Sequence, residues 1–419
     1  MRRMAKMALL FVVFVDLIGQ GLVFPIINSL IMEPSSTLLP ADTSDAARHF
    51  NYGLVIGIFF LAWFFGVVYI AKVSDSIGRK NALLICLGGA LAGYVITIVA
   101  LFIDSLWLLI LGRAITGFTA GNQPIAQAAM IDASADAADR DRNMGYIVTG
   151  VSFGLVGGPI IGGILSDQSL LGSLASVEAP FYAATLLVVI AIVLVLLYFR
   201  DVRQERTPFV LRPIEIFENL WQVTKHLSVL RLMPAYVCFM VANVTFYVFI
   251  DNYLTSAFGY GIIGGSAVML VIGFALAFSS TFLVKPTQER FDKRRIITVT
   301  MVVWAVMALA VAASPVALLC FVPVFLFYFC FGVAYPTMLG LFSGSVGEAD
   351  QGWVMGITTA VFTLAGGVMS LIGGILMSLD IRLPFYITAG MAVLALAFVL
   401  AGWSRPEIER LTERPQPAQ

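Results

Sequence analysis

Three charged residues stand inside long apolar stretches of this chain: Asp16, Arg113 and Asp251. A charge at the centre of a bilayer costs at least ~2.5–3.5 kcal/mol on insertion scales, so each one needs a reason. Asp16 is the candidate for carrying a proton, because a carboxyl group changes its protonation state with its hydration and its neighbouring charges. The alternative is a structural Asp bonded to a neighbouring helix. Both histidines, His49 and His226, lie in connections, so a histidine relay is not expected.

A polar stripe runs along one later stretch, where Asn243, Tyr247 and Asp251 recur every four residues and Asn252 stands beside them. Residues four apart share one face of a helix. Because such a face is costly in lipid, it should point into a cavity or toward another part of the protein. A ligand contact and an external gate fit equally well, and Asp251 is a second candidate for carrying a proton.

Amide and aromatic side chains supply further candidates for lining a cavity. Gln20 lies one helical turn from Asp16, and Gln123 and Gln127 lie one turn apart on the stretch that carries Arg113. The two later glutamines either donate to a bound molecule or bond between helices. Tyr328 and Tyr335 either line the cavity or pack within it.

The composition shows which elements must position these residues. The chain has 419 residues, of which 60% are hydrophobic and 12% charged, and a soluble domain is nearer to a quarter charged. Apolar runs of about 20 residues fit the hydrocarbon core of a bilayer. Twelve such runs are predicted as spanning helices: 7–30, 52–71, 81–102, 106–131, 143–166, 180–199, 231–257, 262–284, 296–313, 316–342, 353–378 and 384–403.

Charge sets the orientation and excludes several classes of protein. Of the 25 Lys and Arg, 22 lie at the amino end, in alternate connections, in the central linker and in the tail, so both termini are expected in the cytoplasm. Equal numbers of basic and acidic residues argue against nucleic acid as a partner. The four cysteines have no metal-site or disulfide spacing, and neither an HExxH nor a Walker sequence is present. We therefore expect that the protein binds no metal or cofactor and is not an enzyme.

The chain divides at its one long basic connection. Residues 1–199 form a predicted amino-terminal six-helix bundle, 200–230 a cytoplasmic linker, 231–404 a second six-helix bundle and 405–419 a cytoplasmic tail. Within the linker, apolar residues at helical spacing among charges fit a helix lying on the membrane surface. A flexible tether is the alternative.

An internal repeat relates the two bundles. The sequence IIGGIL at 160–165 recurs as LIGGIL at 371–376. Pro124 corresponds to Pro336, and SDSIGRK at 74–80 aligns with QERFDKR at 288–294. The offsets are nearly constant. In transporters with such repeats, the substrate cavity lies between the halves.

Glycines mark one predicted helix as a moving part. Gly150, Gly154, Gly158 and Gly162 recur every four residues, and Pro159 stands among them. A face without side chains allows very close helix packing in lipid, and proline removes a backbone donor and bends the helix.

Taken together, these motifs resemble the major facilitator superfamily. The sequence AKVSDSIGRKNALL keeps Asp75, Gly78, Arg79 and Lys80 of that family's loop motif, and RAITGFTAGNQP is similar to its Arg-x-x-x-Gly motif. The glycine-rich segment resembles the antiporter motif of drug/proton antiporters with twelve spanning helices, and VDLIGQGLVFPII is similar to their tetracycline-exporter branch. The antiporter hinge motif is carried by Gly154, Gly158, Pro159, Gly162 and Gly163.

The resemblance implies roles for several residues. Arg113 would tune the proton-carrying carboxylate. Asp75 would face the start of span 11, and Arg79 would pair with an acid at the end of span 4, where Asp132 stands. These contacts would act on a cytoplasmic gate. The candidate gating residues are Asp75, Gly78, Arg79 and Asp132, with Glu289 and Arg290 in the weaker second copy.

The resemblance also implies a function. We expect an all-α membrane protein of the major facilitator fold that exports amphipathic small molecules such as drugs in exchange for protons, as a secondary active transporter. A monomer in a bacterial inner membrane is expected. The alternatives are a dedicated exporter of one metabolite or siderophore and, less favoured because the glycine-rich motif is intact, a proton-coupled uptake symporter.

Overall fold

The computed structural model contains helices and connecting turns, and no strands, in the residues that it describes, which are 3–34, 36–132, 134, 137–201, 215–347, 350–404 and 406–412. The side chain of Gln20, residues 202–214 of the linker and residues 413–419 of the tail lie outside this description. Two compact units form. One comprises Met1–Leu211 with Gly259–Leu270, and the other Arg212–Phe258 with Val271–Gln419.

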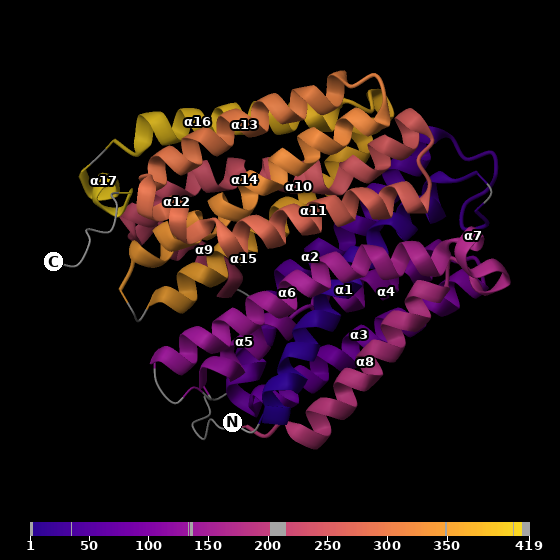
Figure 1. Cartoon of the computed structure of the whole chain (residues 1–419), viewed down its shortest axis with the longest axis horizontal. Coiled ribbons are helices and arrows are strands. Elements are labelled where there is room, and N and C mark those ends of the chain that lie inside the picture. Colours follow the sequence, from indigo (N-terminus) through magenta and orange to yellow (C-terminus); the bar gives the residue numbers. More distant parts are fainter. Residues whose placement is uncertain are drawn as a thin grey trace. The chain divides into compact units, whose positions relative to one another are not determined.

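The helices of the first unit run side by side (Figure 1). Their order is α1 Arg3–Met32, α2 Asp45–Ile77, α3 Arg79–Phe102, α4 Leu106–Phe118, α5 Asn122–Asp132, α6 Ala137–Ser166, α7 Gln168–Leu171 and α8 Ala179–Tyr198. Ser44 caps α2 by accepting a hydrogen bond from the Ala47 backbone N–H, which satisfies one of the orphan donors of the first turn. Their apolar side chains fill the interior of the unit.

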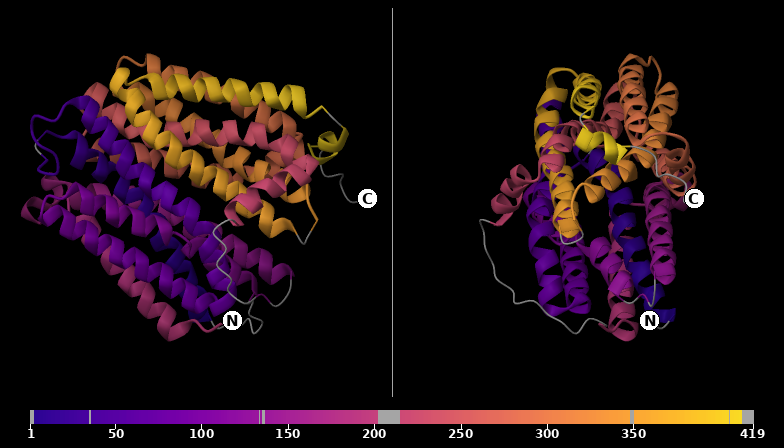
Figure 2. Two further views of the ribbon diagram at one scale, coloured as in Figure 1. Left: turned by 180° about the vertical axis from the view of Figure 1, so that it is seen from behind. Right: turned by 90° about the vertical axis from the view of Figure 1, so that its left-hand side faces the viewer.

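The second unit begins with a short helix in the linker, α9 Glu215–Gln222. The longer helices follow as α10 Leu227–Phe258, α11 Ile262–Phe282, α12 Val284–Arg290, α13 Lys293–Ala313, α14 Ala317–Gly344, α15 Gln351–Leu379 and α16 Leu383–Gly402, with α17 Pro406–Thr412 at the end. The beginning of α11 belongs to the first unit. In both views of Figure 2, α13 and α16 lie side by side along one edge of the second unit.

The packing partners repeat between the two units. In the first unit α1 packs on α6 and α8, and α3 packs on α4 and α8. In the second unit α10 packs on α15 and α16, and α13 packs on α14 and α16. These are the same pairs by order along the chain, so the sequence repeat corresponds to a repeated helix arrangement.

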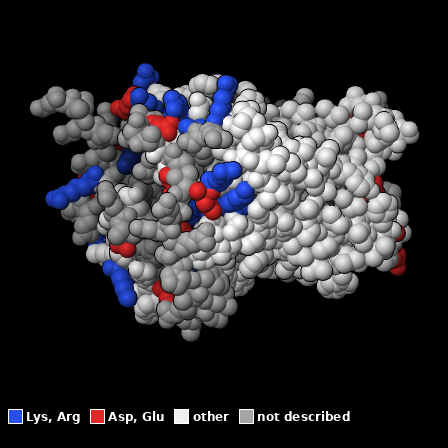
Figure 3. Space-filling model, turned by 90° about the horizontal axis from the view of Figure 1, so that it is seen from below, with Lys and Arg blue, Asp and Glu red and all other residues white. Residues whose placement is uncertain are grey.

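Eleven helices in the described part of the chain are long and apolar enough to cross a membrane. The remaining predicted span, 106–131, was wrong as a single helix, because α4 ends at Phe118 and α5 begins at Asn122. On the face drawn in Figure 3, Lys and Arg gather toward one end and the rest of the surface carries almost no charge. This pattern is the one expected for helices that cross lipid.

Candidate functional site

The interruption between α4 and α5 positions Asp16. The Thr119 hydroxyl donates to the Ile115 carbonyl at 2.8 Å, and the Gly121 N–H donates to the Thr119 carbonyl at 2.8 Å, so the chain turns out of the helix here. Pro124 then falls in the first turn of α5, where its missing N–H costs nothing. The result is a new helix N-terminus within a membrane span.

This N-terminus holds the carboxylate of Asp16, which comes from α1. The Asn122 side-chain Nδ2 donates to Asp16 Oδ1 at 3.1 Å. Asn122 is 2% exposed, and its Oδ1 has no hydrogen-bond partner in the structure. A helix N-terminus carries partial positive charge, so the site favours an anion.

Arg113 reaches the same place from α4. It is buried, its guanidinium carbon lies 4.2 Å from the centre of the Phe59 ring, and its Nε has no hydrogen-bond partner in the structure. A cavity of about 30 Å³ is lined by Asp16, Arg113, Tyr94, Phe59 and Asn122, among others. That volume suits about one or two water molecules.

Two glycines make room for this cavity. A side chain at Gly117 would collide with the Phe59 backbone, so Gly117 lets α4 approach α2 closely beneath Arg113. A side chain at Gly19 would collide with the hydroxyl of Tyr94, which therefore reaches α1 one turn from Asp16. Sequence reasoning missed Asn122, Tyr94 and Phe59. Only the Gly-Asn-x-Pro run at 121–124, a helix-start signal within an apolar stretch, could have indicated the first of them.

The predicted glycine face of α6 packs directly on α1. A Cβ atom added at Gly154 would lie 2.6 Å from the Leu17 Cβ and 2.8 Å from the Phe14 carbonyl oxygen, and one at Gly162 would lie 3.2 Å from the Leu22 Cα. Gly158 and Pro159 are buried beside them, and α6 continues through Pro159 without interruption. This face therefore fixes the part of α1 that carries Asp16. Gly163 faces Ser266 at the start of α11, which belongs to the same unit.

The predicted loop motif forms an ion-pair network at the charged end of the first unit. Arg79 binds Asp132 at the end of α5, with Nε to Oδ2 at 3.1 Å, which is the pairing that the family resemblance implies. Its Nη1 also lies 2.9 Å from Asp75 Oδ1 and donates to Ser74 Oγ at 2.8 Å. The expected approach of Asp75 to the start of α15 would join the two units and stays a prediction.

The backbone conformation at position 78 explains why glycine stands there. Its φ is +96°, a region that side chains rarely tolerate, and a Cβ there would collide with the Asp201 carboxylate. Asp201 accepts hydrogen bonds from the Lys80 backbone N–H at 3.2 and 3.3 Å. Asp201 therefore caps the beginning of α3, a role that the sequence did not indicate.

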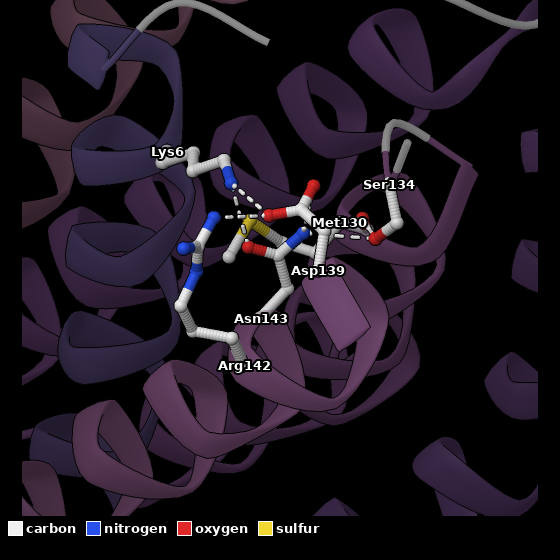
Figure 4. Close-up of polar contacts among 6 residues, drawn as sticks. All are labelled: Lys6, Met130, Ser134, Asp139, Arg142 and Asn143. Carbon is white, nitrogen blue, oxygen red and sulfur yellow. Dashed lines mark hydrogen bonds and ion pairs between the residues drawn. The ribbon is translucent and has the colours of Figure 1, made fainter. Parts of the chain in front are cut away.

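A second polar cluster, which the sequence analysis did not single out, joins α1 to α6 at the same end (Figure 4). Lys6 binds Asp139 at 3.1 Å and donates to Asn143 Oδ1 at 2.8 Å. The fully buried Asn143 donates through Nδ2 to Ser134 Oγ at 2.8 Å and to the Met130 carbonyl at 3.4 Å. We call these residues the Lys6 cluster. Because Met130 belongs to α5, the cluster also contacts that helix.

The second unit gathers most of the remaining candidates around an aromatic cluster. Tyr247 and Tyr328 meet edge to face with ring centres 6.3 Å apart. Phe331, which the sequence analysis did not select, lies 6.2 Å from Tyr328 and stacks on Tyr335 at 5.1 Å. Neither Asn243 Oδ1 nor the Tyr328 hydroxyl has a hydrogen-bond partner in the structure. Asp251 and Asn252, adjacent residues about one turn beyond Tyr247 on α10, are buried.

The other predicted site residues are less organised. Gln127 contacts the Met144 sulfur at 3.6 Å, a contact between α5 and α6, and Gln123 is half-buried at the start of α5. Glu289 lies 3.9 Å from Lys285 on the surface of α12, and Arg290 is exposed. Within the part that the structure describes, the second copy of the loop motif therefore lacks the ion-pair network that Arg79 forms in the first.

These features define a class of protein: a multi-pass membrane transporter with two similarly packed helical units. The chain belongs to the Major Facilitator Superfamily, whose family model matches residues 9–287 and 232–419. Tetracycline resistance protein, class B, of Escherichia coli is 25% identical over 382 residues, which are 87% of this chain and 86% of that protein. Quinolone resistance protein NorA of Staphylococcus aureus is 22% identical over 396 residues, covering 94% and 95%.

Solved structures agree with this fold. The D-xylose-proton symporter superposes with a TM-score of 0.75 at 14% identity, covering 96% of this chain and 98% of that one. The human organic anion transporter MFSD10 gives a TM-score of 0.68 at 15% identity, covering 95% and 99%. The expected fold is therefore confirmed, and the sequence relatives confirm the resemblance to the tetracycline-related branch.

Proposed function

We propose that this protein is a proton-coupled exporter, an antiporter, of amphipathic small molecules such as drugs, and that it works by alternating access. It resides in the cytoplasmic membrane of a bacterium with both termini in the cytoplasm, acts as a monomer and uses no cofactor. The observation that carries the proposal is the Asp16 site: a carboxylate within a span, held by a helix N-terminus, beside a small cavity shared with Arg113.

Asn122 suits either protonation state of this carboxyl group. When Asp16 is charged, the Asn122 amide donates to it, as in the structure. When a proton from water binds a carboxylate oxygen of Asp16, the new hydroxyl group has a ready acceptor in the unpartnered Asn122 Oδ1. Protonation leaves the Arg113 charge uncompensated in the cavity. A net charge in a buried site is costly, so protonation favours a conformation in which the site becomes more hydrated or rearranges.

Helix α5 links this proton site to the charged end of the unit. Its first residue, Asn122, binds Asp16, and its last residue, Asp132, binds Arg79. The Met130 carbonyl, in its last turn, accepts from Asn143 of the Lys6 cluster. The helix is 11 residues long, or about 15 Å at 1.5 Å per residue. A displacement at Asp16 is thereby transmitted to both polar networks, which act as the cytoplasmic gate.

The aromatic cluster of the second unit supports an amphipathic substrate. Tyr247 and Tyr335 are partly exposed, and the Asn243 amide oxygen has no hydrogen-bond partner in the described part of the chain. Few polar groups among aromatic walls are typical of small-molecule sites. Two relatives named for resistance to tetracycline and to quinolones make these compounds the first substrates to test.

The test uses purified protein in liposomes with an imposed pH gradient. We expect wild-type protein to move tetracycline or a quinolone against its concentration gradient and to stop when a protonophore collapses the pH gradient. Asp16→Asn should abolish this active transport while keeping the substrate affinity within about twofold. A matched control is Asp42→Asn, since Asp42 is an exposed acid in the loop between α1 and α2.

Active transport by Asp16→Asn at the wild-type rate would contradict the proton assignment. Net uptake together with protons would show a symporter instead of an exporter. Transport of only one compound in a wide panel would favour the dedicated exporter over a drug exporter.

A further inference from the structure

We propose that the second unit carries a binding site for one anionic phospholipid, in a groove between α12, α13 and α14. The groove has a volume of about 290 Å³. Its walls are mainly apolar and include Leu283, Ile296, Val299 and Phe329, and Arg295 stands at its edge together with Thr287. An apolar groove with a cation at one end matches the polarity of a phospholipid, in which an acyl chain is followed by a phosphate.

Arg295 is available for a phosphate. Its guanidinium carbon lies 5.1 Å from the centre of the Phe291 ring, and no residue in the described part of the chain forms a hydrogen bond or ion pair with it. The neighbouring Arg294, by contrast, donates to the Leu400 carbonyl at 3.1 Å and to Ser404 Oγ at 2.9 Å. A guanidinium group offers several donors in a fixed plane, which matches phosphate oxygens.

An aromatic strip continues the groove along the helices. Phe274, Phe278 and Phe282 recur every four residues on α11 and are 55%, 41% and 63% exposed. Phe278 stacks on Phe329 of α14 with ring centres 6.3 Å apart, and Phe329 lines the groove. From Phe282 to Phe274 the strip extends about 12 Å, close to the ~15 Å depth of one leaflet's hydrocarbon.

Charge favours an anionic headgroup over a neutral one. Residues 285–295 contain five basic and two acidic residues, so the segment has a net charge of +3. Within this segment, Glu289 lies 3.9 Å from Lys285, so these two charges offset one another. Basic residues at a membrane surface attract anionic lipid headgroups. The site is independent of the Asp16 carboxylate and of the direction of transport.

The experiment is native mass spectrometry of the purified wild-type chain with phosphatidylglycerol or phosphatidylcholine of the same acyl chains. We expect one phosphatidylglycerol to bind about tenfold more tightly than phosphatidylcholine, the preference expected for a charge-assisted contact. Arg295→Gln should remove this preference, and Arg295→Lys should keep part of it. Arg290→Gln removes the same charge from the exposed end of α12, outside the groove, and should change it less than twofold.

Equal binding of both lipids by the wild-type chain would overturn the proposal, and this comparison requires no variant to fold. Equal losses in Arg295→Gln and Arg290→Gln would also overturn it, because they would indicate a diffuse surface charge. Phe278→Ala tests the strip: since its side chain is exposed, the fold should persist while both lipids bind more weakly. Displacement of the bound lipid by a transported drug at its transport concentration would assign the groove to substrate instead.

Discussion

Asn122 is the side chain that turns a charge within a span into a defined site. An isolated carboxylate there would pay the desolvation cost of its charge alone. Instead, Asp16 accepts a hydrogen bond from the Asn122 amide at the first turn of α5. Asn122 thus positions Asp16 and does not itself carry a proton.

We expect Asn122→Ala to lower the turnover of proton-driven transport about tenfold, with KM for substrate near the wild-type value. A hydrogen bond to a charged group contributes about 1.5–3 kcal/mol, and its loss leaves the Asp16 carboxylate less well held. Asn122→Ser keeps a donor and an acceptor at the helix start and should retain more turnover. Initial rates in liposomes at several substrate concentrations separate the two constants. A rise in KM with unchanged turnover would instead place Asn122 in the substrate site.

At the scale of the element, the contact between α1 and α6 depends on missing side chains. Backbone lies within van der Waals range of where the Gly154 Cβ would stand, so neither helix can yield by a simple rotation of a side chain. The same glycines that the sequence marks as a flexible face therefore hold the carboxylate-bearing helix in place. Close packing and mobility are compatible, because a smooth face allows two helices to slide.

Gly154→Ala should destabilise the protein, with a loss of about 1–3 kcal/mol, which is typical of overpacking. The added Cβ would stand 2.6 Å from that of Leu17 and 2.8 Å from the Phe14 carbonyl oxygen. The matched control is Gly145→Ala in the same helix, where nothing lies within 4 Å of the added atom. That variant should be neutral or more stable by up to ~1 kcal/mol through helix propensity. Thermal unfolding in detergent, followed by tryptophan fluorescence, measures both, and equal stabilities would refute close packing at Gly154.

The break between α4 and α5 shows where sequence reasoning stops at this scale. Hydropathy predicts the span, because 106–131 is mainly apolar, but it does not show that the helix is interrupted. The proline does not decide the matter alone: Pro336, the counterpart of Pro124, lies inside the unbroken α14. What differs is the Thr-Ala-Gly-Asn run at 119–122, whose side chains and glycine favour a helix end and a new start.

For the whole molecule, the lengths of the apolar runs predicted the spans, and matching short segments in the two halves predicted the repeat. Contacts across long separations were predicted only where a motif resemblance supplied them, as for Arg79 and Asp132. In the Lys6 cluster, Lys6 contacts Asp139 and Asn143, which lie 133 and 137 positions further along the chain, and no local sequence pattern predicts these contacts. Such contacts decide how a site within the span affects the end of the unit.

Coupling through α5 can be measured by a double-mutant cycle on turnover with Asn122→Ala and Asp132→Asn. The two positions lie at opposite ends of α5, about 15 Å apart, and changes at that separation without shared partners usually add. If α5 transmits the state of Asp16 to the Arg79 network, the loss of turnover in the double variant should be smaller than the product of the two single-variant losses. We expect the difference to be about fivefold or more. The control cycle pairs Asn122→Ala with Asp42→Asn, which shares no element with it and should be additive. Additive effects in both cycles would mean that the proton site and the gate do not communicate through this helix.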